Sequence, residues 1–123
     1  MCTILLPIKP EYADRIMAET KLYEYRKKQC KRKVVKILIY STSPIKKVVG
    51  EVKVIEILSL DPQSLWNITK NYSGISKEKY QEYYRNSELA IAYKLGEVNV
   101  YKKPIDLKDI GINYYPQSYV YLD

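Results

Sequence analysis

The apolar pattern of residues 48–58, VVGEVKVIEIL, constrains the fold more than any other stretch of this sequence. Val52 and Val54 fall on one face of a strand, whereas Ile55 and Ile57 fall on the other, so the pattern changes phase. Such a change indicates a bulge or a sharp bend, and the glycine near the start of the stretch permits one. Sheets curl through bends of this kind, so the stretch favours a small curled barrel over a flat sheet.

Further strands are predicted on both sides of this stretch. Residues 2–8 form an apolar run of strand length, and Pro7 confines its end to an edge or a bend. Residues 34–41, VVKILIYS, are typical of a central buried strand. Alternating or short apolar patterns predict three more strands, at residues 21–26, 89–95 and 118–122.

Three short helices are predicted between the strands, each with a start signal and an apolar face. The first helix starts at Pro10, and Tyr12, Ala13, Ile16 and Met17 form its apolar face. The second starts at Asp61-Pro62, with Leu65, Trp66 and Ile68 as its buried face. The third starts at Ser76, with Tyr80, Tyr83 and Tyr84 at helical spacing. A further short helical turn is expected at residues 107–110. We therefore predict one α+β domain over residues 1–123, with five to six strands and about three short helices.

The composition excludes several kinds of chemistry. The chain has no histidine, which removes Ser-His-Asp and Cys-His catalysis and histidine-ligated zinc. Two cysteines, Cys2 and Cys30, are too few and too far apart for a zinc site, so we expect no metal and no cofactor. We expect a cytoplasmic protein outside the membrane, because no apolar run approaches spanning length and no secretory signal is evident.

The positive charge of the chain is local. Residues 26–36 hold seven basic residues and no acidic one. Removing these seven from the 21 Lys and Arg leaves 14, which equals the 14 Asp and Glu, so the rest of the chain is neutral. Besides Arg26, the predicted phosphate contacts are Lys27, Lys28, Lys31, Arg32, Lys33 and Lys36. A solvated hairpin tip that only aids solubility is the alternative.

The stretch ETKLYEYR, residues 19–26, resembles the signature of the ASCH domain, the ASC-1 homology branch of the PUA-like superfamily. That signature reads Gly-x-Lys-x-x-Glu-x-Arg after the first helix; Lys21, Glu24 and Arg26 match, and Glu19 stands in the place of the glycine. IKPEYADRI, IYSTSPIKKVVGE, YSGIS and PQSY are similar to a microbial group of stand-alone ASCH proteins, in the same order.

The resemblance implies a curled PUA-like barrel with a cleft that recognises RNA or a modified nucleotide. Some members are hydrolases: one branch removes the acetyl group of N4-acetylcytidine with a lysine, a threonine and a glutamate, and a ribonuclease is described in another. Lys21 matches that lysine, but Glu24 occupies the place of the threonine.

Whether the three signature residues share one cleft is open at the level of sequence. Strand alternation places Glu24 and Arg26 on one face and Lys21 on the other, so only a corner at residues 21–23 would bring them together. Within a cleft, Glu24 and Arg26 must pair, because an unpaired buried charge is unfavourable. Otherwise they form an exposed ion pair worth under about 1 kcal/mol.

Further candidate cleft residues lie at strand ends. Tyr40 can stack a base, and hydroxyl and amide groups near it in the predicted barrel can bind one, namely Ser41, Thr42, Gln117 and Ser118. Ordinary turn chemistry is the alternative for the hydroxyls. Glu51, next to the bend, could pair with Lys21 as an acid-base couple, and a partly exposed strand carboxylate is the other interpretation.

These observations favour a protein that binds RNA, single-stranded nucleic acid or a modified nucleotide, with basic residues on phosphates and a polar cleft on a base. A second hypothesis is a small hydrolase, a nucleoside amidohydrolase or a ribonuclease, with Lys21, Glu24 and Glu51 as catalytic candidates. A third is a module whose basic arm binds an acidic protein. The sequence indicates no oligomeric state.

Overall fold

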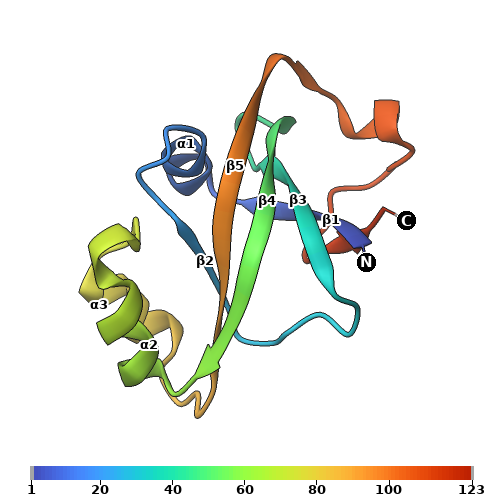
Figure 1. Ribbon diagram of the computed structural model, residues 1–123. Helices are drawn as coiled ribbons and strands as arrows, with labels where there is room; N and C mark the ends of the chain where they lie inside the picture. Colours follow the sequence, from blue (N-terminus) through green and yellow to red (C-terminus); the bar gives the residue numbers. More distant parts are fainter. Residues whose placement is uncertain (1, 123) are drawn as a thin grey trace.

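A computed structural model describes residues 2–122 and contains one six-stranded sheet with three α-helices and two short 3-10 helices (Figure 1). The strands are β1 (Cys2–Ile8), β2 (Tyr23–Arg26), β3 (Val34–Ser41), β4 (Lys47–Leu60), β5 (Ala90–Ile105) and β6 (Val120–Tyr121). The helices are α1 (Pro10–Met17), α2 (Pro62–Thr69), η1 (Lys70–Tyr72), α3 (Lys77–Tyr83) and η2 (Leu107–Ile110).

The sheet has the strand order β2-β5-β4-β3-β1-β6. Only β1 and β3 run parallel; the other pairs are antiparallel. The pairing of β4 shifts register near Gly50 on both sides, and again around Val54 against β5. These irregularities curl the sheet into a half-barrel, so the predicted α+β class and curled sheet are confirmed.

Gly50 is needed at the curl because other atoms approach its backbone closely. A Cβ atom there would lie 2.5 Å from Met17 Sδ and 2.6 Å from the carbonyl oxygen of Asn99. The glycine therefore lets α1 pack against the inner face of the bent strand, where Ala13 and Ile16 are fully buried.

The local helix signals act as the sequence predicts. Asp61 accepts a hydrogen bond from the Ser64 amide at 3.0 Å, and Ser76 accepts one from the Lys79 amide at 3.2 Å. Each side chain satisfies an amide that the first turn of its helix leaves unpaired.

Two parts of the prediction were wrong. Ile68 is 60% exposed, although it was expected in the buried stripe of its helix. β5 extends to Ile105, ten residues beyond the predicted end at residue 95. This second half pairs with the start of β4 and is largely exposed, so it carries little of the apolar alternation that marks a strand.

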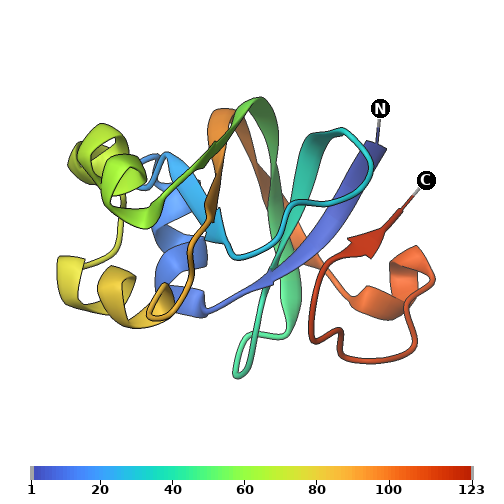
Figure 2. The same ribbon diagram turned by 90° about the horizontal axis from the view of Figure 1, so that it is seen from below.

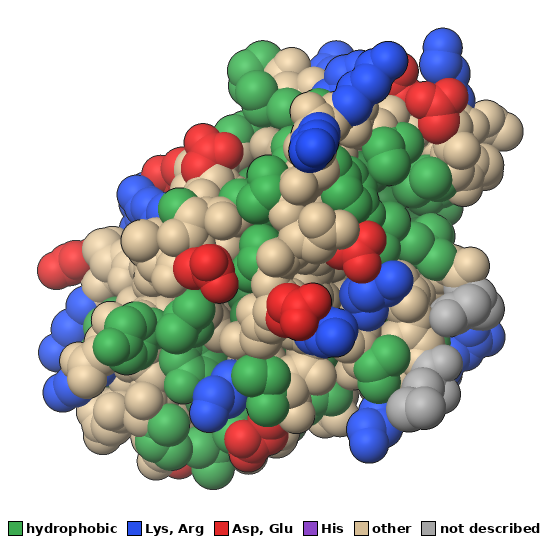
Figure 3. All heavy atoms as spheres, turned by 45° about the horizontal axis from the view of Figure 1, so that its top comes forward, with side chains coloured by type: hydrophobic (Ala, Val, Ile, Leu, Met, Phe, Trp, Pro, Cys, Tyr) green, Lys and Arg blue, Asp and Glu red, His purple; other side chains and the backbone are tan. Residues whose placement is uncertain are grey.

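The helices and the chain ends lie at opposite ends of the sheet. Figures 1 and 2 both place α1, α2 and α3 at one end, and η2, β6 and the two termini at the other. Figure 3 shows one face of the molecule, on which acidic and basic side chains are interspersed with apolar ones. No continuous basic surface covers the face seen in this view. Among residues 2–122 no helix is long and apolar enough to cross a membrane.

Candidate functional site

A pocket of about 580 Å³ opens between α1, β2 and α3. Its lining includes the three signature side chains Lys21, Glu24 and Arg26. The other lining residues are Pro7, Ile8, Lys9, Tyr12, Tyr25, Lys27, Ile75, Lys79, Glu82 and Tyr83. The structure therefore brings together the residues whose convergence the sequence left open.

A corner between α1 and β2 makes this convergence possible. The amides of Glu19 and Thr20 bond the carbonyls of Ile16 and Arg15, each at 3.0 Å, and Glu19 has φ 61°. This is a Schellman helix end, in which Glu19 takes the left-handed conformation that glycine adopts most easily. The strand then begins only at Tyr23, so Lys21 is not bound by the alternation of β2.

Lys21 is buried with its charge directed at a backbone carbonyl. The residue is 3% exposed, and its Nζ donates to the carbonyl oxygen of Ser73 at 2.6 Å. Nζ also lies 4.8 Å from the centre of the Tyr25 ring and 5.5 Å from that of Tyr12. Burial lowers the pKa of Lys21 to about 8; Glu24 opposes this shift, while Arg15 and Arg26 add to it.

Gly74 covers the aliphatic part of Lys21. Its φ is +66°, and a Cβ atom there would lie 2.4 Å from both Cβ and Cγ of Lys21. Arg15 fixes the same segment by donating from Nη1 to the Gly74 carbonyl at 2.9 Å. The segment after η1 therefore holds Lys21 from outside, and only glycine fits at this contact.

Glu24 and Arg26 form a paired charge on one face of β2. Arg26 Nη2 lies 2.9 Å from Glu24 Oε2 and donates to the carbonyl oxygen of Pro7 at 3.1 Å. The Arg26 side chain is 26% exposed, and the Glu24 side chain is 9% exposed. Arg26 Nε is buried, and no hydrogen-bond partner for it lies within residues 2–122. The pair is therefore oriented, with one buried donor still to satisfy.

The basic segment divides into an exposed loop and a paired residue. Lys27, Lys28, Lys31, Arg32 and Lys33 are exposed in the connection between β2 and β3, which we call the basic loop (residues 27–33). Lys27 also lines the pocket, with Nζ 5.0 Å from the centre of the Tyr83 ring. Lys36 differs from the prediction, because it lies on β3 and its Nζ is 3.2 Å from Glu51 Oε2.

Several predicted cleft residues lie elsewhere in the molecule. Glu51 pairs with Lys36 and accepts from the Tyr101 hydroxyl at 2.8 Å, so it forms no couple with Lys21. Tyr40 is 2% exposed in a core cluster with Leu5, Val48, Leu107 and Ile112. Tyr40 does not line the pocket, because the side chains of β3 alternate between two interior clusters and none of them faces the pocket.

The remaining predicted side chains also lie outside the lining of the pocket that residues 2–122 form. Ser41 is 1% exposed, and its hydroxyl finds no hydrogen-bond partner within that range. Thr42 begins a turn after β3, where its amide bonds the Ile8 carbonyl at 3.0 Å. Gln117 and Ser118 are exposed in the loop before β6.

Sequence reasoning did not single out Tyr12, Ser73, Gly74 and Tyr83 as parts of the site. Tyr12 and Tyr83 were read as helix core, and they pack against clusters while also lining the pocket. Ser73 acts through its backbone, so its side chain carries no signal. Gly74 lies within the family-like stretch YSGIS, and that glycine was the available clue. Among residues 2–122 no group of three His, Cys, Asp or Glu could hold a metal ion.

Comparison with solved structures decides the family. The crystal structure of ASCH from Zymomonas mobilis superposes with a TM-score of 0.91 at 28% identity, covering 98% of this chain and 87% of that one. This chain belongs to the ASCH family. The resemblance seen in the sequence and the PUA-like form of the curled sheet are thereby confirmed.

Three further comparisons place this ASCH chain among its relatives. It is 29% identical over 123 residues to the ASCH domain-containing ribonuclease of Zymomonas mobilis, covering 96% of this chain and 82% of that protein. It is 34% identical over 121 residues to a Ureaplasma parvum protein named ATP synthase subunit alpha, of which it spans only 15%. A family model described as a domain of unknown function, DUF365, matches residues 1–113.

Proposed function

We propose that this ASCH protein binds RNA, single-stranded nucleic acid or a modified nucleotide, with a base in the Lys21 pocket and phosphates on the basic loop. The observation that carries the proposal is Lys27, which belongs to both parts: it lines the pocket and begins the loop. A relative named as a ribonuclease supports the coarser statement that the domain has an RNA-related function.

The pocket offers the groups that recognise a base. Arg26 lines the pocket with a side chain that is 26% exposed, and Glu24 holds its guanidinium in place. A guanidinium and a carboxylate pair well with base edges, since one donates and the other accepts hydrogen bonds. Tyr12, Tyr25 and Tyr83 add aromatic rings to the wall, as in many sites that read unstacked bases.

The basic loop offers the phosphate contacts. Its five basic side chains are exposed, and phosphate binding by such side chains releases counterions and therefore weakens with salt. Each contact to single-stranded nucleic acid contributes about 0.7 to the slope of log affinity against log salt. The number of phosphate contacts can therefore be measured from the salt dependence of the binding affinity.

The test is fluorescence anisotropy of a short labelled RNA at several salt concentrations, with two double variants of equal charge change. Lys28→Gln/Lys31→Gln lies in the basic loop, and Lys102→Gln/Lys103→Gln removes exposed lysines of β5. We expect the first to lower the salt slope by about 1.4 and the second to leave it unchanged. Equal effects of the two variants, or no salt-sensitive binding at all, would overturn the proposal.

A second candidate function is hydrolysis of a nucleoside amide or of RNA, favoured by the lowered pKa of Lys21. With a pKa of about 8, a substantial fraction of Lys21 is neutral at pH 7.5 to 8.5 and can accept a proton from water or from a ribose hydroxyl. The proton would then pass to the leaving group. Glu24, which raises the pKa of Lys21, would be the neighbouring carboxylate in this role, and not Glu51.

Mass spectrometry of RNA and modified nucleosides, N4-acetylcytidine included, after incubation with the protein separates the two functions. Binding alone predicts retention with no chemical change. Hydrolysis predicts a product that Lys21→Met abolishes, and a pH profile whose rising limb has a midpoint near 8. A product that forms equally with Lys21→Met would exclude Lys21 as the base.

A further inference from the structure

Arg32 is the one arginine of the basic loop, and its side chain lies against an aromatic ring. Its guanidinium carbon Cζ is 4.2 Å from the centre of the Tyr121 ring, and Arg32 itself is exposed. The Arg32 amide also donates a hydrogen bond to the Tyr121 hydroxyl at 3.3 Å. Tyr121 therefore fixes both the backbone and the side chain of a residue that lies 89 positions away in sequence.

Tyr121 is held in place by the sheet and by a second ring. It belongs to β6 and pairs with Ile4 on β1, and the Leu122 amide next to it bonds the Thr3 carbonyl at 3.0 Å. Its ring meets the Tyr119 ring edge to face, with ring centres 5.2 Å apart. Tyr121 is half-buried against the core cluster that contains Ile4. The ring under Arg32 is thus a fixed support.

The part of the basic loop around Arg32 is anchored as well. Cys30 is 6% exposed, and its amide donates to the Tyr93 hydroxyl at 3.5 Å. The carbonyl of Lys33 accepts from the Cys2 amide at 2.9 Å. Arg32 therefore lies between two residues that are tied to the core, which limits how far its backbone can move.

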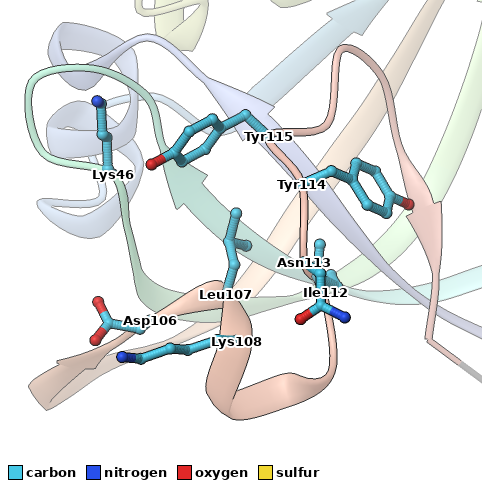
Figure 4. Close-up of a pocket in the computed structure, with 8 residues that line it drawn as sticks. All are labelled: Lys46, Asp106, Leu107, Lys108, Ile112, Asn113, Tyr114 and Tyr115. Carbon is cyan, nitrogen blue, oxygen red and sulfur yellow. The ribbon is translucent and has the colours of Figure 1, made fainter.

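The pair of Arg32 and Tyr121 is not part of either pocket. A second pocket of about 530 Å³ is lined by Lys46, by residues of η2 and by the loop after η2, as Figure 4 shows. Neither Arg32 nor Tyr121 belongs to this lining or to that of the Lys21 pocket, as the described residues form them. The pair lies on open surface, where a ligand would reach it directly from solvent.

We propose that Arg32, held on Tyr121, stacks a base of a single-stranded RNA whose phosphates bind the lysines of the basic loop. A guanidinium is planar and stacks on flat rings. One face of Arg32 lies over Tyr121, so a base on the opposite face would complete a stack of three layers. Arginine planes and aromatic rings are the common supports for unstacked RNA bases. Tyr121 is then a positioning residue, which acts through Arg32.

This role rests on the proposed function, because the lysines must bring the strand to the loop. It differs from phosphate binding in what it requires of residue 32. Phosphate binding requires a positive charge, which lysine also has, and its strength depends on salt. Stacking requires the flat guanidinium, which lysine lacks. Arg32→Lys therefore separates the two roles without changing the net charge.

The experiment is fluorescence anisotropy of the whole chain with two labelled probes: octauridylate and an octamer with abasic sites in place of the bases. We expect Arg32→Lys to weaken octauridylate binding about 5-fold or more, the low end of what one stacked base contributes. Binding of the abasic octamer and the salt slope should stay unchanged. Arg85→Lys is the matched control, because Arg85 is an exposed arginine that lines neither pocket and lies outside the basic loop.

A second variant tests the positioning role of Tyr121. Tyr121→Leu removes the ring under Arg32 and should weaken octauridylate binding by a similar factor. Combining it with Arg32→Lys should give no further loss, because the two residues act as one unit. Circular dichroism checks that Tyr121→Leu is folded, and Arg32→Lys, which changes only an exposed side chain, decides the stacking role independently.

Several outcomes would overturn the stacking role. Unchanged octauridylate binding by Arg32→Lys would mean that charge alone suffices. An equal loss on both probes would make Arg32 a phosphate contact or an anchor of the loop. Competition by polyglutamate as strong as that by octauridylate would assign the loop to an acidic protein instead. Absence of RNA binding by the unchanged protein would overturn the proposed function as well, so the two failures are distinguishable.

Discussion

Charged residues 21–26 and 27–33 are neighbours in sequence, yet the structure uses their charges in opposite ways. Lys21, Glu24 and Arg26 are buried or half-buried, and each has a fixed partner: a carbonyl, an arginine or a carboxylate. The basic residues of the loop are exposed to solvent. Charged residues of the same types are thus held at fixed positions in residues 21–26, whereas in residues 27–33 they attract anions over a longer range.

Burial, and not the number of charges, decides what a lysine does in these two segments. Desolvation lowers the pKa of Lys21 toward neutral pH, whereas an exposed lysine stays protonated and acts as a point charge. Substitutions should therefore change stability and pH behaviour in the pocket, and salt-dependent binding in the loop. Substitutions of residues in and around the Lys21 pocket test this contrast.

The largest effect is expected for Gly74→Ala. The new Cβ would meet Lys21 at 2.4 Å on a backbone with φ +66°, so overpacking and strain add, to about 3 kcal/mol of lost stability. Gly111→Ala is the control, because φ there is +80° but no atom lies within 4 Å, and strain alone costs about 1 kcal/mol. Urea unfolding measures both, and equal losses would mean that Gly74 does not clamp Lys21.

Breaking the buried ion pair should have the next largest effect. Glu24→Ala leaves the Arg26 charge half-buried without its partner, which we expect to lower the free energy of unfolding by about 2 kcal/mol. Glu97→Ala removes one member of the Lys53–Glu97 pair, whose side chains are 64% and 74% exposed, and should change stability by less than about 0.5 kcal/mol. Equal losses in the two variants would show that the pocket pair is no more than a surface contact.

Lys21 should also give the protein a specific pH dependence. Its pKa is about 8 when folded and 10.5 ordinarily, so between these values the unfolded chain binds the proton that the folded chain has lost. Lys21 by itself therefore contributes a rise in stability of about 2 kcal/mol from pH 8 to pH 10, whereas the buried tyrosines, whose pKa values burial raises, contribute a fall as the pH approaches 10. Lys21→Met should remove this rise in urea unfolding at several pH values, and parallel curves for the two proteins would contradict the lowered pKa.

The smallest effect concerns the corner that delivers Lys21 to the pocket. Glu19 holds φ 61° at the helix end, where glycine has no steric penalty, so Glu19→Gly should raise stability by up to about 1 kcal/mol. Ala18→Gly is the control, because Ala18 has φ −81° and should lose stability instead. A loss in Glu19→Gly would mean that the glutamate side chain contributes more than the backbone strain removes.

Much of the fold could be read from local patterns. Asp61 and Ser76 mark helix starts because capping depends on residues within one turn, and the phase change near Gly50 marks the bend because side chains alternate along a strand. Ile68 was misplaced because its exposure depends on what packs against it, and the sequence does not record that. The second half of β5 was missed because its residues are largely exposed.

The α+β class, the curl, the identity of the signature residues and the position of the excess charge follow from local sequence patterns, since each is a property of residues close together in the chain. The meeting of Lys21 with Glu24 and Arg26 comes instead from packing between distant segments, as do the pair between Glu51 and Lys36 and the burial of Tyr40 in the core. These outcomes depend on contacts such as that between Lys21 and Ser73, 52 residues apart in sequence. A pocket arises where distant segments pack, and packing is decided by the whole molecule.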